Sequence, residues 1–293
     1  MTMPVGEEFF DGPPLEKLAP SGGSVHTKWV SVGATLWPAE AIWEAVAPFQ
    51  PGFTVEILPE IDSTNSELMR RAKAGQLDPI LLVAEQQTAG RGRLGRVWSS
   101  GLTSEKPSTE STSLTFSLGL PLSPQSWSGL SLVVGLSVAQ SLHPALRLKW
   151  PNDIWLQGRK LAGILIETAS FGGIRYVVAG IGINIGPRGP QGLSTPPAWL
   201  HELAPGIDAP KALASVAQPL VAAIQQFAAL GFAPFQQGFN ALDALAGRDV
   251  VMSDGTAGQA RGVDASGALL VATAHGVKAV TSSEISVRPA AKA

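Results

Sequence analysis

The feature that most constrains the fold is a series of short apolar runs between residues 146 and 183, separated by turn residues at the spacing of β-hairpins. We predict four strands here, over residues 146–150, 154–157, 161–169 and 175–183. Hairpin spacing favours neighbouring antiparallel strands, whereas parallel strands need longer helical crossovers. The chain is therefore predicted to adopt an α+β fold with a mixed or antiparallel central sheet, and not a doubly wound one.

Other segments supply elements around this sheet. A strand over 54–58 precedes a helix that begins near Asp62, where Thr64 and Glu67 have the spacing of a capping box and Gly75 is a suitable end. Further strands are predicted over 80–86 and 113–118. Helices are predicted over 38–46, 127–143, 211–230 and 234–244.

The pattern of apolar and turn residues changes at Gly247. Short β-like runs then alternate with Gly-containing turns, which is typical of a small SH3-like β-barrel. The expected domains are an irregular N-terminal arm (1–50), a large domain (51–246) and the C-terminal barrel (247–293).

Composition excludes several classes of protein. The 293 residues include no cysteine, which excludes a disulfide framework, a thiolate zinc site and a cysteine nucleophile. The N-terminal segment lacks the basic-then-apolar pattern of a secretory leader. The apolar stretch 130–142 is interrupted by Ser, Gly and Gln, so we predict no membrane span. We expect a cytoplasmic protein that does not act on membranes.

One segment concentrates cations although the net charge of the chain is only −2. Residues 90–98 read Gly-Arg-Gly-Arg-Leu-Gly-Arg-Val-Trp and follow an apolar run. Glycine lets backbone N–H groups approach an anion closely, and arginine offers planar donors to carboxylate or phosphate. The segment lacks the Gly-Lys-Ser/Thr of a P-loop and the context of a dinucleotide fingerprint. Taken alone, it fits either an anion-binding loop or a flexible nucleic-acid-binding segment.

Four further segments carry polar residues or glycines beside predicted strands. Each also has a purely structural explanation, because Pro-Asn-Asp is a good turn sequence and Gly-Arg-Lys suits a solvated hairpin tip. The segments are Glu-Gln-Gln-Thr (85–88), Lys-Trp-Pro-Asn-Asp-Ile-Trp (149–155), Gly-Arg-Lys-Leu-Ala-Gly-Ile-Leu-Ile-Glu (158–167) and Gly-Ile-Gly-Ile-Asn (180–184).

We call residues 90–98 the arginine loop. In order, spacing and local composition, this loop and the four segments resemble those of biotin–protein ligases. The resemblance is dense over 62–185 and weaker through the C-terminal part, where 282–288 is similar to the ending of the family. It implies a catalytic domain of the class II aminoacyl-tRNA-synthetase-like fold over 51–246. It also implies ATP-dependent transfer of biotin, through biotinyl-5′-AMP and with Mg²⁺, to a lysine of a biotin carboxyl carrier protein.

The resemblance also implies roles for individual residues. Fixed cations around the biotin carboxylate and the α-phosphate would stabilise the charge that develops during adenylation. These catalytic residues are Lys160, Arg91 and Arg93. The implied biotin site adds Ser63, Thr64, Asn65, Gln87, Gly92, Gly163, Gly180 and Gly182. The implied nucleotide site comprises Arg93, Arg96, Trp98, Lys149, Asn152, Asp153, Asn184 and Arg288, with Asp153 as the magnesium ligand.

Three alternatives remain open. A lipoate–protein ligase shares the fold and the adenylate chemistry, but lipoate has no ureido ring for Gln87 to recognise. A non-catalytic biotin-binding regulator could do without Lys160 and Asp153. An Arg/Gly RNA-binding protein would be expected to have a broader basic patch. The chain departs from the family in an insertion over 103–112. Its N-terminal arm shows no helix-turn-helix pattern, so DNA binding is not expected, and a homodimer is neither required nor excluded.

Overall fold

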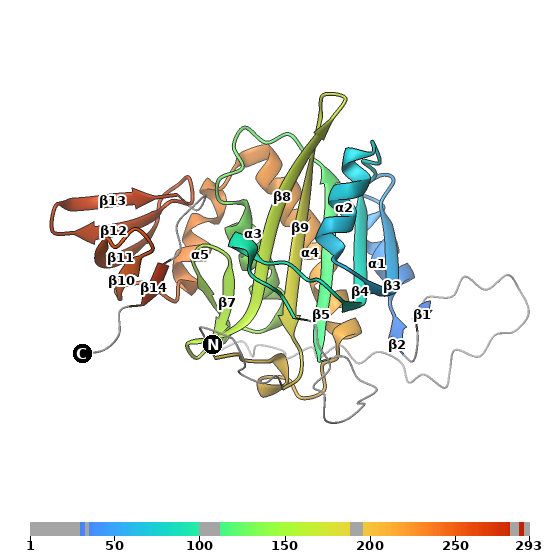
Figure 1. Cartoon of the computed structure of the whole chain (residues 1–293), viewed down its shortest axis with the longest axis horizontal. Coiled ribbons are helices and arrows are strands. Elements are labelled where there is room, and N and C mark those ends of the chain that lie inside the picture. Colours follow the sequence, from blue (N-terminus) through green and yellow to red (C-terminus); the bar gives the residue numbers. More distant parts are fainter. Residues whose placement is uncertain (1–29, 33–34, 100–111, 188–195, 282–286, 290–293) are drawn as a thin grey trace, which may run out of the picture.

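A seven-stranded mixed sheet forms the centre of the molecule in the computed structural model, which describes residues 30–32, 35–99, 112–187, 196–281 and 287–289 (Figure 1). The strand order is β3-β4-β5-β9-β8-β7-β6. The first two strands pair in parallel, and all other neighbours are antiparallel. The strands are β3 (Thr54–Ile61), β4 (Ile80–Gln87), β5 (Ser113–Pro121), β6 (Arg147–Lys149), β7 (Asp153–Leu156), β8 (Arg159–Phe171) and β9 (Ile174–Asn184). The predicted mixed sheet of an α+β fold is confirmed.

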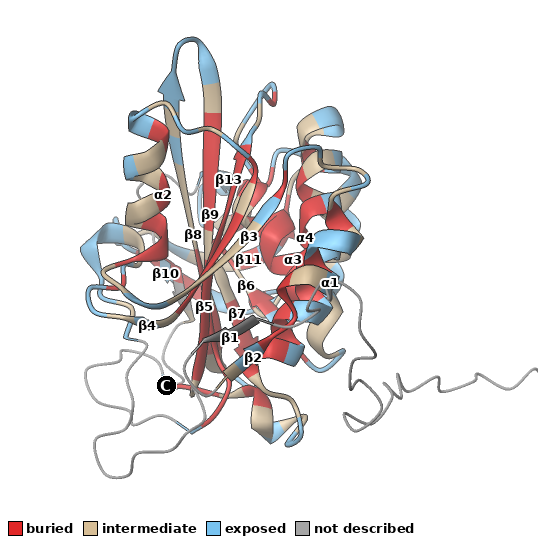
Figure 2. Ribbon diagram, turned by 90° about the vertical axis from the view of Figure 1, so that its right-hand side faces the viewer, coloured by how far each residue is buried: buried red, intermediate tan, exposed pale blue. Residues whose placement is uncertain are grey.

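Helices cover both faces of this sheet unequally. Figure 2 shows α1 (Ala39–Val46), α3 (Leu130–Leu142) and α4 (Ala209–Leu230) on one side and α2 (Thr64–Lys73) alone on the other. Strand β5 is buried along eight of its nine residues, because α4 packs on one face and α2 on the other. This two-sided cover explains why β5 lacks the simple alternation of a half-exposed strand.

The long helix α4 is apolar enough to span a membrane by length and composition alone. In the structure it packs against α3 and α1, and its buried stripe includes Leu213, Leu220 and Phe227. This arrangement is that of a core helix.

Several predicted boundaries move in the structure. Strand β3 continues to Ile61, and the helix after it is capped by the Ser63 side chain, which accepts a hydrogen bond from the Ser66 N–H. The prediction of a capping box at Thr64 and Glu67 was therefore wrong by one residue. Strands β8 and β9 are longer than predicted, because their pairing continues to Phe171 and Ile174 at the tip of the hairpin. This hairpin projects beyond the rest of the sheet (Figure 1).

The end of the predicted N-terminal arm belongs to the main core. Helix α1 occupies 39–46, close to the prediction, and is preceded by a small hairpin of β1 (Val30–Val32) and β2 (Thr35–Trp37). Trp37, Ile42 and Val46 are almost fully buried in the large hydrophobic cluster. The description of 1–50 as an irregular arm therefore fails for residues 35–50, because their apolar side chains pack against α4 and the sheet.

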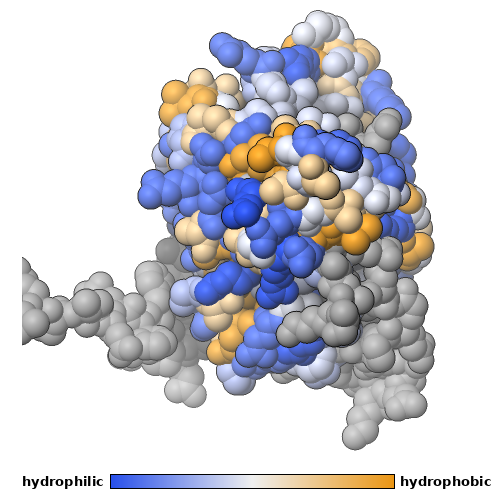
Figure 3. Space-filling view, turned by 90° about the vertical axis from the view of Figure 1, so that its left-hand side faces the viewer, coloured by the Kyte–Doolittle hydropathy of each residue, from blue (hydrophilic) through white to orange (hydrophobic). Residues whose placement is uncertain are grey.

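The C-terminal residues form a five-stranded antiparallel sheet in the order β13-β12-β11-β10-β14. One face buries Val250, Leu269 and Val271, whereas the other exposes Val251 and Val277. Figure 3, which views the molecule from the side of this sheet, shows small apolar areas scattered among polar ones. The strands are β10 (Asp249–Met252), β11 (Ala257–Val263), β12 (Leu269–Thr273), β13 (Gly276–Val280) and β14 (Val287–Pro289).

Polar contacts fasten this small sheet to the large domain. The buried Trp150 indole donates to the Gly267 carbonyl at 3.2 Å, and the Ser128 hydroxyl donates to the Ser266 carbonyl at 2.6 Å. From α5 (Gln236–Leu242), the Asn240 side chain bonds both the N–H and the carbonyl of Val263. The buried side chains of the two domains also form one continuous cluster.

Candidate active site

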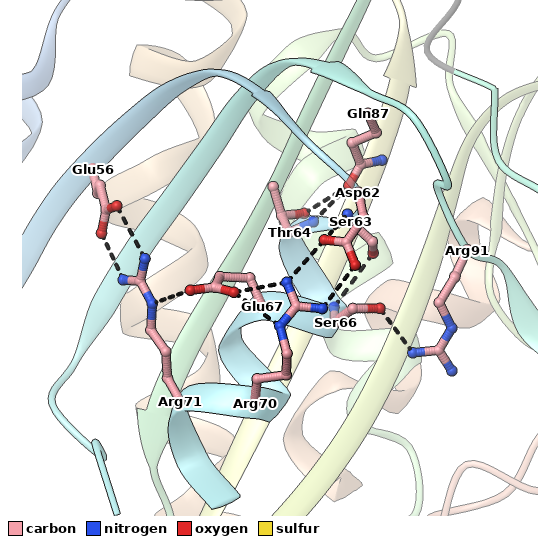
Figure 4. Close-up of polar contacts among 10 residues, drawn as sticks. All are labelled: Glu56, Asp62, Ser63, Thr64, Ser66, Glu67, Arg70, Arg71, Gln87 and Arg91. Atoms are coloured by element: carbon pink, nitrogen blue, oxygen red, sulfur yellow. Dashed lines mark hydrogen bonds and ion pairs between the residues drawn. The ribbon is translucent and has the colours of Figure 1, made fainter. Parts of the chain in front are cut away.

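A cluster of polar side chains forms where α2 begins beside the end of β4 (Figure 4). Parallel pairing places Ile61 of β3 opposite Gln87 of β4, so the helix that follows β3 starts next to the Gln87 side chain. Oε1 of Gln87 accepts hydrogen bonds from the Thr64 N–H at 2.8 Å and from the Thr64 hydroxyl at 3.1 Å. The first turn of a helix has unpaired N–H groups, and here one of them is directed to a side chain that the sequence had singled out.

Asn65 lies deeper, over the sheet. Its Nδ2 donates to the Glu167 carboxylate at 2.9 Å and to the Leu165 carbonyl at 3.3 Å. A methyl group on Gly180 would lie 2.0 Å from Oδ1 of Asn65. The absence of a side chain at Gly180 is therefore what admits the Asn65 amide.

Ser117 joins these residues and was missed from the sequence. It is fully buried on β5, with its hydroxyl 2.7 Å from both the Thr64 hydroxyl and Oδ1 of Asn65. Ser113, Thr115 and Ser117 alternate along an otherwise apolar strand and are all buried. That polar alternation was a usable signal, because buried hydroxyls need hydrogen-bond partners on the same face.

A network of ion pairs braces α2 against β3 (Figure 4). Arg71 bonds the Glu56 carboxylate on β3 and Glu67 within the helix, and Arg70 bonds Glu67 and Asp62. The hydrogen bond from Arg71 lowers the pKa of Glu67, and that from Arg70 lowers the pKa of Asp62. These side chains hold the start of the helix, and none of these ion pairs involves the Gln87 side chain.

The arginine loop is a short hairpin that folds back on itself. The Trp98 N–H donates to the Gly90 carbonyl at 2.9 Å, and the Gly92 N–H donates to the Arg96 carbonyl at 2.7 Å. Leu94 is exposed in the left-handed region, with φ of 56° and ψ of 38°, which is uncommon for a residue other than glycine. In Figure 1 the loop passes in front of β9 and β8.

The three arginines of the loop have different surroundings. Arg91 forms an ion pair with Glu167 on β8, with a closest distance of 3.0 Å. Arg93 donates to Oδ1 of Asn152 at 3.3 Å. Burial lowers the pKa of Arg93, and the nearby Asp153 carboxylate opposes this shift. Arg96 is exposed.

Lys160 lies beside Asp153 and Lys149. Nζ of Lys160 is 2.6 Å from the Asp153 carboxylate, and Nζ of Lys149 is 3.9 Å from it. The Lys149 ammonium also lies over the Trp155 ring, 5.4 Å from its centroid. The turn between β6 and β7 thus brings Lys149 close to Asp153, and the pairing of β7 with β8 adds Lys160. Both Asp153 and Lys149 are mostly shielded from solvent.

A track of glycines separates these cations from the polar cluster at the start of α2. Gly163 on β8 pairs with Gly182 on β9, and Leu165 pairs with Gly180. A methyl group on Gly182 would lie 2.2 Å from the Trp98 indole, and one on Gly163 would lie 3.2 Å from Nζ of Lys160. The Trp98 ring therefore packs against the glycine track, next to Lys160.

Two predicted site residues are tied to other parts of the structure. The Asn184 amide donates to the main-chain carbonyls of Lys160 and Ala198, and Asn184 is buried. Arg288 lies on β14, where its backbone pairs with Val251. Neither observation tests the predicted nucleotide contacts. The insertion 103–112 lies outside the described residues except for Thr112.

No group of three or more His, Cys, Asp or Glu side chains that could hold a metal occurs in the part of the chain that the structure describes. Asp153 offers one carboxylate and is flanked by Lys149 and Lys160. Mg²⁺ is commonly held by one or two carboxylates together with substrate phosphates. The residues therefore suit a cation that arrives with phosphate, and not one held by protein ligands alone.

The chain is similar to proteins of a known family. Residues 58–184 match the model of the biotin/lipoate A/B protein ligase family, and 249–288 match the biotin protein ligase C-terminal domain. The bifunctional ligase/repressor BirA of Escherichia coli (strain K12) is 37% identical over 254 residues, which cover 82% of this chain and 76% of that protein. The chain belongs to the biotin–protein ligase family.

Other members of the family extend the similarity. The biotin–[acetyl-CoA-carboxylase] ligase of Paracoccus denitrificans is 33% identical over 249 residues and is matched over 98% of its length. The biotin protein ligase of Aquifex aeolicus, solved in complex with biotin and ATP, superposes with a TM-score of 0.68 at 30% identity. That superposition covers 80% of this chain and 99% of the other. The family and the fold predicted from the sequence are both confirmed.

Proposed function

We propose that this ligase couples biotin to a lysine of a biotin carboxyl carrier domain in two steps, with biotinyl-5′-AMP as the intermediate and AMP as the final leaving group. The observation that carries the proposal is the placement of Lys160 and Arg93 across the glycine track from the Thr64–Gln87 pocket. One end of this site suits a neutral polar ring, and the other suits two anions.

The polar end suits the ureido ring of biotin. Ser63, Thr64 and Asn65 come from one helix start, and Gln87 closes the pocket from β4. A ring with N–H and C=O groups needs both acceptors and donors, and an unmet buried group costs about 1–3 kcal/mol. Gly180 and Gly182 lack side chains, which lets the Asn65 amide and the Trp98 ring pack against the sheet beside these polar residues.

The cationic end suits the first chemical step. An oxygen of the biotin carboxylate attacks the α-phosphorus of ATP, and pyrophosphate leaves. Arg91, Arg93 and Lys160 provide charges that lower the repulsion between the two anions and stabilise the pentavalent transition state. We assign no covalent role to Lys160.

The nucleotide would lie toward the turn between β6 and β7. Lys149 and Asn152 offer donors there, Arg96 suits the pyrophosphate side, and Trp98 offers an aromatic face. Asp153 would be a protein ligand of a Mg²⁺ ion that the phosphates also bind, and the ion would neutralise phosphate charge. Arg288, Gly92 and Asn184 remain proposed contacts on the strength of the family resemblance.

In the second step the acceptor lysine amine attacks the carbonyl carbon of the mixed anhydride, and AMP leaves with the electron pair of the broken C–O bond. The amine must lose a proton at this stage. The carboxyl carrier domain of a carboxylase is the acceptor we propose. We also propose that the enzyme acts in the cytoplasm, where ATP is available, as a monomer or homodimer and without binding DNA or membranes.

Biotin-dependent exchange of labelled pyrophosphate into ATP tests this function. Wild-type protein should catalyse exchange with biotin, and Lys160→Ala should lower the rate by roughly a hundred- to a thousandfold. Lys211→Ala is the matched control, because Lys211 is exposed on α4 and away from the site. Exchange with lipoate instead of biotin would support the lipoate ligase alternative, and no exchange with either ligand would refute adenylation.

A further inference from the structure

Glu167 lies next to the proposed biotin pocket and has no role in the chemistry described above. It belongs to β8, where residues two apart share a face, so its side chain lies on the same face as Gly163 and Leu165. Its carboxylate accepts three hydrogen bonds. One comes from Nδ2 of Asn65 at 2.9 Å, and two come from the Arg91 guanidinium at 3.0 and 3.2 Å.

These contacts join two separate elements of the site. Asn65 belongs to the start of α2, and Arg91 belongs to the arginine loop. Arg91 also donates to the Ser66 hydroxyl on α2 at 3.3 Å (Figure 4). The first residues of the loop are therefore bound both to α2 and, through Glu167, to β8. Among these contacts, only those of Glu167 reach both the helix residue that lies over Gly180 and the loop.

A carboxylate is required for this arrangement. Its two oxygens accept all three hydrogen bonds without offering a donor. A glutamine in the same position has one acceptor oxygen, and its amide N–H₂ would face either the Arg91 guanidinium or the Asn65 N–H₂. A glutamine oxygen in the place of Oε2 would keep the contacts with Asn65 and with Nη1 of Arg91. The isostere would still lose the ion pair and would set its N–H₂ against Nη2 of Arg91. Of the two side chains in this ion pair, Glu167 is 22% exposed and Arg91 is 49% exposed, so solvent screens part of their attraction.

We propose that Glu167 is a positioning residue that couples the biotin-reading start of α2 to the arginine loop. It holds Asn65 over Gly180 and holds Arg91 across the pocket, so that the two are aligned before ligand enters. This inference rests on the proposed function. It predicts that Glu167 contributes to recognition of biotin and not to recognition of ATP.

The variant Glu167→Gln tests the proposal in the full-length protein by pyrophosphate exchange. We expect the KM for biotin to rise about tenfold, the lower end of the effect of losing a hydrogen-bonded charge. The KM for ATP should stay within twofold of wild type. Glu60→Gln on β3 is the matched control, because Glu60 is exposed away from the pocket, and it should change neither constant.

A second measurement does not depend on activity. If Glu167 anchors the loop, trypsin should cleave after Arg91 or Arg93 faster in Glu167→Gln than in the wild type, without added ligand. In an Arg91→Gln background, Glu167→Gln should add less than a twofold further change in the KM for biotin, because the shared contact is already lost. Equal melting temperatures of the variants establish that they are folded.

The outcomes separate the two proposals. Wild-type protein without biotin-dependent exchange refutes the proposed function, while the trypsin comparison still tests the anchor. Active wild type with an unchanged KM for biotin in Glu167→Gln refutes the positioning role. Equal rises in both KM values, or a lower KM for biotin, also refute it. Equal rises in both KM values would indicate a general structural effect. A lower KM for biotin would indicate that Glu167 competes with the ligand for Arg91.

Discussion

Replacing Gly180 with alanine offers a sharp test of how the proposed biotin site is built. The added methyl group would lie 2.0 Å from Oδ1 and 2.8 Å from Cγ of Asn65, distances that no packed side chain tolerates. Asn65 is 4% exposed and cannot simply turn aside, because its amide is held by Ser117, Glu167 and the Leu165 carbonyl. The variant must therefore displace Asn65 from its place over the sheet.

The size of the effect follows from these contacts. Three hydrogen bonds at about 1 kcal/mol each predict a loss of about 3 kcal/mol in the free energy of unfolding. For a chain of this size, that loss corresponds to a fall of roughly 6–12 °C in melting temperature. Because Asn65 is a proposed biotin contact, affinity for biotin should also fall by about tenfold to a hundredfold.

Differential scanning fluorimetry and calorimetric titration with biotin measure both quantities. Gly206→Ala is the control, since a methyl group there meets no atom within 4 Å. In an Asn65→Ala background, Gly180→Ala should cost less than about 0.5 kcal/mol further, because the obstructing amide is gone. Wild-type stability and biotin affinity in Gly180→Ala, or full additivity in the double variant, would refute this explanation.

Two further predictions concern the charged groups. Burial raises the pKa of Asp243 to about 6, so between about pH 4 and 6 the folded chain binds a proton that the unfolded chain has released. This contribution to stability is present below pH 4 and is lost as pH rises to 6. Across that window, Asp243→Asn should remove up to about 3 kcal/mol of pH dependence from urea unfolding. An unchanged pH profile would contradict this assignment. Separately, calorimetric titration should show Mg²⁺ binding only in the presence of ATP, because Asp153 lies between Lys149 and Lys160. Stoichiometric Mg²⁺ binding to the nucleotide-free protein would contradict it.

Much of the fold could be predicted because local patterns and tertiary packing agree. The strands over 146–183 are bounded by turn residues, and their hairpin spacing leaves little choice of pairing. Boundaries were less predictable where tertiary contacts extend an element, as in the long β8–β9 hairpin. The helix over 38–46 was predicted, but the place of this segment in the core was not, because Trp37 and α1 are buried by contacts with α4 and the sheet.

The site was predictable at the level of motifs but not of partners. The sequence singled out Thr64 and Gln87 separately, and only the parallel register of β3 and β4 shows that they touch. Glu167 and Ser117 were missed because their importance depends on neighbours about 50 to 100 residues away. The structure also gave Asn184 main-chain partners, which spacing along the chain cannot reveal.

The contacts between the two domains limit how evolution could rearrange this enzyme. The C-terminal sheet presents Gly267 to the Trp150 indole and Val263 to Asn240, and its buried face continues the core of the large domain. Such a unit cannot be exchanged between relatives as an independent module. A C-terminal sheet moved into a relative would need Trp150 and the Asn240 side chain of α5 as partners. We therefore expect these segments to have been inherited together with the sheet they contact.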